Sequence, residues 1–144
     1  MPGEWHFEIM IDPASIGTAQ QKKFDPRTRR FFTHPKVARS MRMIALVARL
    51  ALQRRAKAVP PKGSPVFLEL DFYYAAPASR QSATEGSPCT ARWAGDCDNR
   101  AKAVIDALTR AGLWSDDQFV TKLVVTKRWT REMPRISVTV AEDD

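Results

Sequence analysis

The sequence predicts one α/β domain with a mixed β-sheet and two main helices, in the order β-α-β-loop-α-β-β. The chain has 144 residues, of which 44% are apolar, and this length suits a single globular domain over 1–144. Residues 35–52 and 99–111 repeat apolar side chains at helical spacing, whereas shorter stretches alternate with a period of two. Strands interleaved with helices are typical of helices packed on a mixed sheet.

A strand and then a basic loop are predicted near the N-terminus. Phe7, Ile9 and Ile11 alternate with other residues, as in a half-buried strand. Residues 17–34 are polar, turn-rich and basic, with phenylalanines between the cations. This pattern suits contact with phosphates and stacking on bases, although the phenylalanines could instead anchor the loop to the core. The cations expected to contact DNA are Lys22, Lys23, Arg27, Arg29 and Arg30.

The first helix is predicted to begin at Thr33-His34-Pro35, because proline is favoured in the first turn. Apolar residues recur along one side of it and arginines occupy the other. We therefore expect a core-packing helix with a solvated basic face. The apolar stripe consists of Val37, Met41, Ile44, Ala48 and Leu52, with Ala45 alongside.

Residues 66–74 are predicted to form a central strand, after a proline-rich break. One of its faces holds Val66, Leu68, Leu70 and Phe72. Glu69 and Asp71 lie on the other face, where surface or pairing roles are favoured over approach to a metal. Residues 75–95 show no apolar rhythm and are predicted to be a mobile loop beside a functional site. Arg92 in this loop is a candidate DNA contact.

The second helix is predicted to end at Gly112, since glycine suits the left-handed position after a helix. Asp98 or Asn99 suits its N-cap, which gives a helix of about three turns. Its buried side is predicted to comprise Ala101, Val104, Ile105, Leu108 and Ala111. Residues 119–129 and 136–140 are predicted to be strands that form an antiparallel hairpin.

Four aspartates and a lysine surround this second helix. Asp96 and Asp98 precede it, Lys102 follows one turn later, and Asp116 and Asp117 come after its end. Mg²⁺ prefers oxygen ligands, and carboxylates with a lysine suit metal-assisted phosphodiester cleavage. A helix cap, an i, i+4 ion pair and a turn would explain the same residues without chemistry. The carboxylates can meet only if the strand after the helix returns alongside it.

This acidic pattern resembles the signature of the RusA family of Holliday-junction resolvases. The residues that match are Asp96-x-Asp98-Asn99-x-x-Lys102, then Asp106-Ala107-Leu108 and Gly112-Leu113-Trp114-x-Asp116-Asp117. The resemblance implies that Asp96, Asp98 and Asp117 bind a catalytic divalent metal, Mg²⁺ or Mn²⁺, and that Lys102 is needed. It makes Asp116 the less favoured ligand of its pair. The chain departs from the family in having Ala94-Gly95 where a basic residue or proline is usual.

Charge and composition favour a polyanionic partner. The formal net charge is +7 and the pI is about 9.8, and Asp25 is the only acid between Lys22 and Lys62. Cys89 and Cys97 are too few for a disulfide scaffold or a zinc site. The sequence has neither a transmembrane run nor a signal peptide at its start, so we expect a cytoplasmic protein.

Together these features predict an Mg²⁺-dependent, structure-selective endodeoxyribonuclease that resolves four-way DNA junctions by paired nicks. Two symmetric nicks require two sites, so the resemblance implies a homodimer. Two alternatives stay open. One is a metal-dependent nuclease that acts on flaps or single strands. The other is a branched-DNA-binding module without catalysis, in which the aspartates are only caps and turns.

Overall fold

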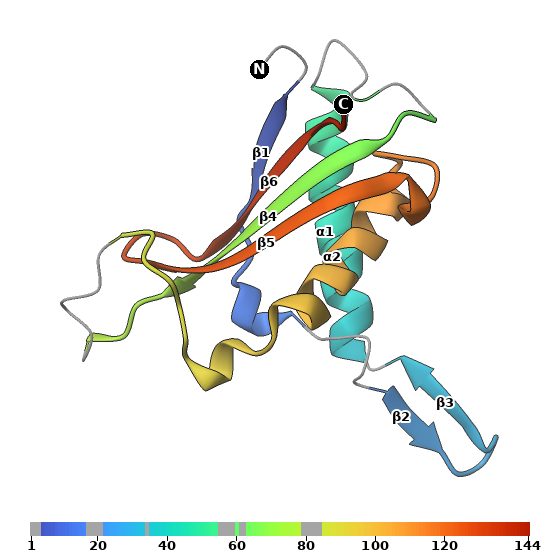
Figure 1. Ribbon diagram of the computed structural model, residues 1–144. Coiled ribbons are helices and arrows are strands. Elements are labelled where there is room, and N and C mark those ends of the chain that lie inside the picture. The colour runs from blue at the N-terminus through green and yellow to red at the C-terminus, as the bar shows by residue number, and fades with distance from the viewer. Residues whose placement is uncertain (1–3, 17–21, 34, 55–59, 61–62, 79–84) are drawn as a thin grey trace.

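The computed structural model describes residues 4–16, 22–33, 35–54, 60, 63–78 and 85–144. Within them a four-stranded sheet carries two helices on one face, and a two-stranded hairpin projects away from this body (Figure 1). The predicted α/β class with a mixed sheet and two main helices is therefore confirmed. No helix in this described part of the chain is long and apolar enough to cross a bilayer.

The sheet has the strand order β1-β6-β4-β5. Its strands are β1 (Trp5–Ile9), β4 (Val66–Ala75), β5 (Val120–Thr130) and β6 (Arg135–Glu142). β4 is central, as predicted, because it pairs in parallel with β5 and antiparallel with β6. The predicted hairpin of β5 and β6 is wrong, because β4 lies between these two strands. Alternation marks a strand but does not specify which neighbour it pairs with.

Helix α1 (Pro35–Gln53) packs against α2 (Cys97–Ala111) and against β1. The predicted stripe of α1 is buried at Met41, Ile44, Ala45 and Ala48. The side chain of Val37 and the predicted helix start at His34 lie outside the described residues. The core lies between the helices and the sheet, where Ile9, Ile44, Leu70, Val104 and Val138 are fully buried.

Helix α2 begins earlier than predicted. Its N-cap is Asp96 rather than Asp98 or Asn99, and its 15 residues make about four turns instead of three. The Asp98 carboxylate instead accepts a hydrogen bond from the neighbouring Asn99 N–H at 3.0 Å. Gly112 ends the helix in the left-handed conformation, at φ 90° and ψ 19°, as predicted.

Strands β2 (Lys22–Asp25) and β3 (Arg30–Thr33) form an antiparallel hairpin. A loop was expected over 17–34, and that expectation is wrong for these two strands, while 17–21 and 34 lie outside the described residues. The Asp25 carboxylate accepts a hydrogen bond from the Arg27 N–H at 2.9 Å, and Arg29 has a φ of 55°. Asp at a turn start followed by a left-handed residue favours a tight reversal.

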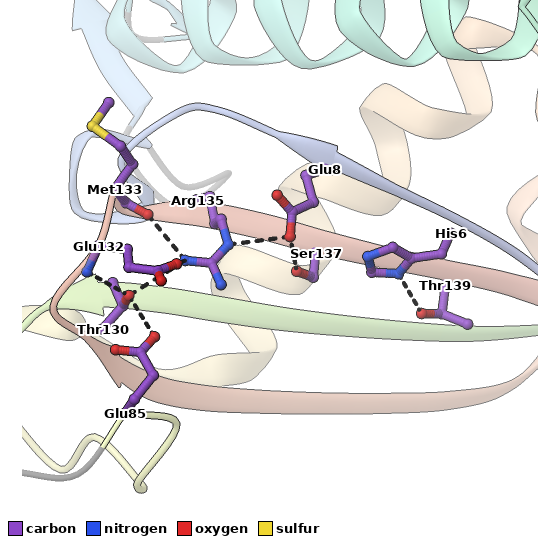
Figure 2. Close-up of polar contacts among 9 residues, drawn as sticks. All are labelled: His6, Glu8, Glu85, Thr130, Glu132, Met133, Arg135, Ser137 and Thr139. Carbon is purple, nitrogen blue, oxygen red and sulfur yellow. Dashed lines mark hydrogen bonds and ion pairs between the residues drawn. The ribbon is translucent and has the colours of Figure 1, made fainter.

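The second face of the sheet carries polar side chains that pair with one another (Figure 2). Arg135 bonds Glu8 at 3.2 Å and stacks 4.2 Å from the centre of the Tyr73 ring, while His6 bonds Thr139 at 3.1 Å. Asp71 accepts a hydrogen bond from Thr126, which confirms the pairing role favoured for this residue. Burial, together with the neighbouring Asp71 charge, raises the pKa of Glu69.

Candidate functional site

The short segment before α2 is fixed by buried hydrogen-bond donors. The carbonyl of Ala94 accepts from Tyr74 Oη at 3.0 Å and from Arg100 Nε at 2.8 Å, and the Gly95 carbonyl accepts from Lys127 Nζ at 2.7 Å. Burial raises the pKa of Tyr74, which keeps its hydroxyl protonated as a donor. The backbone leading to Asp96 is therefore placed by the sheet and by α2 together.

Arg100 links this segment to a distant part of the chain. Its guanidinium also donates to the carbonyls of Pro13 at 2.6 Å and Ile16 at 2.7 Å, and the residue is only 8% exposed. Charge-assisted bonds to three carbonyls offset the desolvation of the guanidinium. The sequence reasoning missed Arg100. The available signal was a charged residue four positions before Val104, within the buried stripe of α2.

A pocket of about 260 Å³ lies between α2 and β5. Its polar lining consists of Asp98, Lys102, Asp106 and Asp117. Its apolar lining consists of Ala101, Ile105, Leu123 and Val125. β4 and β5 are parallel and α2 connects them, so β5 returns alongside α2 as the predicted site requires. Three predicted site residues therefore share a pocket.

The carboxylates are spread along this pocket rather than gathered at one point. Asp98 and Asp106 are eight residues apart, a rise of about 12 Å along α2. The charge of Asp106 raises the pKa of Asp117, so these two carboxylates lie near each other, at the end of the pocket away from Asp98. Asp96 does not line the pocket. Among the described residues, no three His, Cys, Asp or Glu side chains are grouped closely enough to hold a metal ion.

Asp117 begins the short 3₁₀ turn η4 (Asp117–Phe119) after α2. A side-chain hydrogen bond with Asp116 raises the pKa of Asp117, and the charges of Asp116 and Asp106 raise it further. Exposed carboxylates that repel one another in this way favour a shared proton or a bound cation. Asp106, which sequence reasoning placed in the motif without a role, therefore belongs to the candidate site.

The predicted DNA contacts whose side chains the structure describes do not line this pocket. Arg27, Arg29 and Arg30 are exposed at the turn between β2 and β3, and Arg92 is exposed in the 3₁₀ turn η3 (Arg92–Ala94). The side chains of Lys22 and Lys23 are not among those that the structure describes. Residues 85–95 of the predicted mobile loop bond to β5, for example through Cys89 N–H to the Lys127 carbonyl at 2.9 Å.

The fold and this pocket define a small α/β protein with a carboxylate-and-lysine site between a helix and the outer strand of its sheet. The family model for endodeoxyribonuclease RusA matches residues 13–141, so the chain belongs to that family. The chain is also similar to the crossover junction endodeoxyribonuclease RusA of Escherichia coli O139:H28 (strain E24377A / ETEC). The two are 40% identical over 47 residues, which cover 33% of this chain and 39% of that relative.

Proposed function

We propose that this protein is an Mg²⁺-dependent endodeoxyribonuclease that resolves four-way DNA junctions by paired nicks. Membership of the RusA family supports this function, as does the name of the Escherichia coli relative. The observation that carries the proposal is the single pocket shared by Asp98, Lys102 and Asp117.

The donor chemistry of the pocket fits a hard divalent cation. Mg²⁺ usually keeps several waters and binds one or two carboxylates together with substrate phosphate. Spread carboxylates suit that mode better than a closed cage of protein ligands would. From the family resemblance we propose Asp96, Asp98 and Asp117 as ligands of Mg²⁺, or of Mn²⁺ in its place, although Asp96 does not line the pocket. Asp106, whose charge acts on Asp117, is a further candidate at that end. When bound, the metal would supply Lewis-acid stabilisation of charge on the phosphate.

The side chains of the pocket would then divide the remaining work. Lys102 is exposed on the same side of α2 as Asp98 and would neutralise charge that develops on the scissile phosphate. A carboxylate not engaged with the metal would orient the attacking water and accept its proton. Lys22, Lys23, Arg27, Arg29, Arg30 and Arg92 would bind phosphates of the junction arms.

Paired nicks on opposite strands require two active sites. We therefore propose a homodimer with one pocket in each protomer. We also propose that the protein acts in the cytoplasm.

The proposal is tested with a synthetic four-way junction, a matched duplex and a flapped duplex, each incubated with Mg²⁺ or with EDTA. Asp98→Asn is compared with Asp144→Asn, an exposed acid in the C-terminal tail. We expect paired nicks on the junction only, lost with EDTA and with Asp98→Asn but not with Asp144→Asn. Preferred cutting of the flapped duplex would support the alternative hypothesis of a flap nuclease and contradict the resolvase hypothesis. Junction binding without any cutting would favour the non-catalytic module.

A further inference from the structure

The outer side of α1 carries a row of exposed apolar side chains. Met43 and Leu46 are each 56% exposed and Leu50 is 45% exposed. Their spacing of three and four residues places them on one side of the helix, away from the buried Ile44 and Ala48. Single exposed apolar residues are ordinary, whereas three that share one side of a helix form a candidate interaction surface. We call Met43, Leu46 and Leu50 the α1 ridge.

A groove runs along each side of the α1 ridge. The groove toward β1 has a volume of about 400 Å³, with Phe7, Val47 and Leu50 among its apolar lining. The groove toward α2 has a volume of about 300 Å³ and includes Ala45 and Leu46. The ridge and its grooves therefore offer both a projection and recesses to an apolar partner surface.

The charges around this surface are of one sign. The exposed cations that line the grooves are Arg42, Arg49, Arg54 and Arg110. Helix α1 contains no acidic residue. Glu8 is the one carboxylate that lines either groove, among the described residues, and it is paired with Arg135 at 3.2 Å. An acidic partner would therefore meet unopposed positive charge.

This surface is separate from the candidate nuclease site. The groove toward β1 lies at one outer edge of the sheet, whereas the acidic pocket lies at the other edge, at β5. The groove toward α2 includes Arg110 but shares no lining residue with the acidic pocket. A second binding function can be tested there without reference to cleavage.

We propose that the outer side of α1 is a docking surface for an acidic amphipathic helix of another protein. Its apolar side chains would pack over the α1 ridge and into the grooves, and its carboxylates would pair with the four arginines. A phosphate backbone offers no apolar group to cover the ridge. A second copy of the chain would bring arginines against arginines if it docked through the same face.

The probe is a fluorescent synthetic peptide of about 18 residues, with leucines at helical spacing and glutamates elsewhere. The control peptide has the same composition with its leucines dispersed around the helix. The protein variants are Leu46→Ser with Leu50→Ser, and Arg42→Gln with Arg54→Gln. Met133→Ser, an exposed apolar residue at the β5–β6 turn, is the matched control. Binding is measured by fluorescence anisotropy.

We expect the wild type and Met133→Ser to bind the first peptide about tenfold more tightly than the control peptide, and both double variants to lose about tenfold in affinity. Equal affinity for the two peptides, or unchanged binding by the leucine variant, would overturn the proposal and leave only non-specific charge attraction. Self-association abolished by the leucine variant in sedimentation would assign the face to a second copy instead. Loss of four-way-junction affinity in that variant would assign it to DNA.

Discussion

Both ends of α2 present exposed aspartates, but the groups around these aspartates differ. At its start, the backbone before Asp96 is fixed by the buried donors Tyr74 and Arg100 and by Lys127. After its end, Asp116 and Asp117 are exposed, and Asp116 raises the pKa of Asp117. The fold fixes the backbone at both ends, since Trp114 after α2 is buried and its Nε1 donates to Thr109 at 2.7 Å. What differs is that the exposed carboxylates after α2 repel one another, and a bound cation would relieve that repulsion.

The largest expected effects come from removing carboxylates of the pocket. We predict that Asp98→Asn and Asp117→Asn each reduce junction cleavage about a hundredfold or more, because each removes a charge that would bind the metal. Asp106→Asn should also reduce cleavage if it acts at the Asp117 end. Single-turnover cleavage measures these losses, with Asp144→Asn as control. Full activity of Asp117→Asn would remove the exposed end from the site.

Asp96→Asn separates a structural role from a chemical one. The Asp96 side chain makes no capping hydrogen bond to α2, so we predict unchanged thermal stability. As a metal ligand, Asp96 would still be needed, and we expect a loss of cleavage comparable to that of Asp98→Asn. Thermal unfolding and cleavage are measured on the same preparations. Retained cleavage with unchanged stability would show that the Asp96 carboxylate is needed for neither chemistry nor stability.

These two ends also show what a sequence can predict. The acidic motif identified the candidate site residues, and the periodicity of α2 predicted a helix between them. Residue spacing did not reveal how far apart the carboxylates lie, because that depends on the extra turn of α2 and on the path of β5. Asp106 could be assigned to the site only from the structure, where it lines the pocket. The pairing of β5 and β6 failed for the same reason, since β4 enters between them from a distant part of the sequence.

Arg100 shows a second limit. Its three carbonyl partners belong to Pro13, Ile16 and Ala94, and no local pattern links those residues to one guanidinium. The β2–β3 hairpin was missed because its strands are short and basic, without the apolar alternation that marks a half-buried strand. In this protein the sequence alone does not predict long-range polar contacts or strands that lie outside the core.

Arg100→Met tests how much of the first end depends on the buried guanidinium. We predict a loss of about 3 kcal/mol in the free energy of unfolding, because three buried carbonyls lose a charged donor while the methionine restores only part of the packing. Urea denaturation measures the change. Arg92→Met, at an exposed arginine of η3, should leave stability nearly unchanged. Equal stabilities of the two variants would show that the bonds to Pro13, Ile16 and Ala94 contribute nothing net.

Tyr74→Phe should have a smaller effect at the same end. The hydroxyl of Tyr74 is one of two donors to the Ala94 carbonyl, so that its loss leaves the bond from Arg100 in place. We predict a loss of about 1 kcal/mol in the free energy of unfolding. Tyr73→Phe, on the opposite face of β4, retains its ring against Arg135 and serves as the control. A larger loss for Tyr73→Phe would contradict the role given to Tyr74.

The smallest effect concerns the titration of Asp117 at the exposed end. Its pKa is raised in the folded protein, so the folded state binds this proton more tightly than the unfolded state does. Any contribution of this group to stability is therefore lost as the pH rises through the range between its ordinary and its raised pKa. Asp116→Asn should lower the pKa of Asp117 toward its ordinary value, whereas Asp144→Asn should not. Carboxyl carbon shifts measured by NMR against pH report the midpoint.

The effect of Mg²⁺ on the titration of Asp117 tests whether this carboxylate binds a metal. A cation bound at Asp117 competes with the proton, so we expect added Mg²⁺ to lower the same midpoint in the wild type. In Asp116→Asn the effect of Mg²⁺ should shrink, because one of the carboxylates that attracts the cation is gone. If Asp116→Asn moves the midpoint but Mg²⁺ does not, the repulsion between the two carboxylates is confirmed, but no metal binds at the exposed end. The carboxylates at the start of α2 would then have to supply the ligands alone.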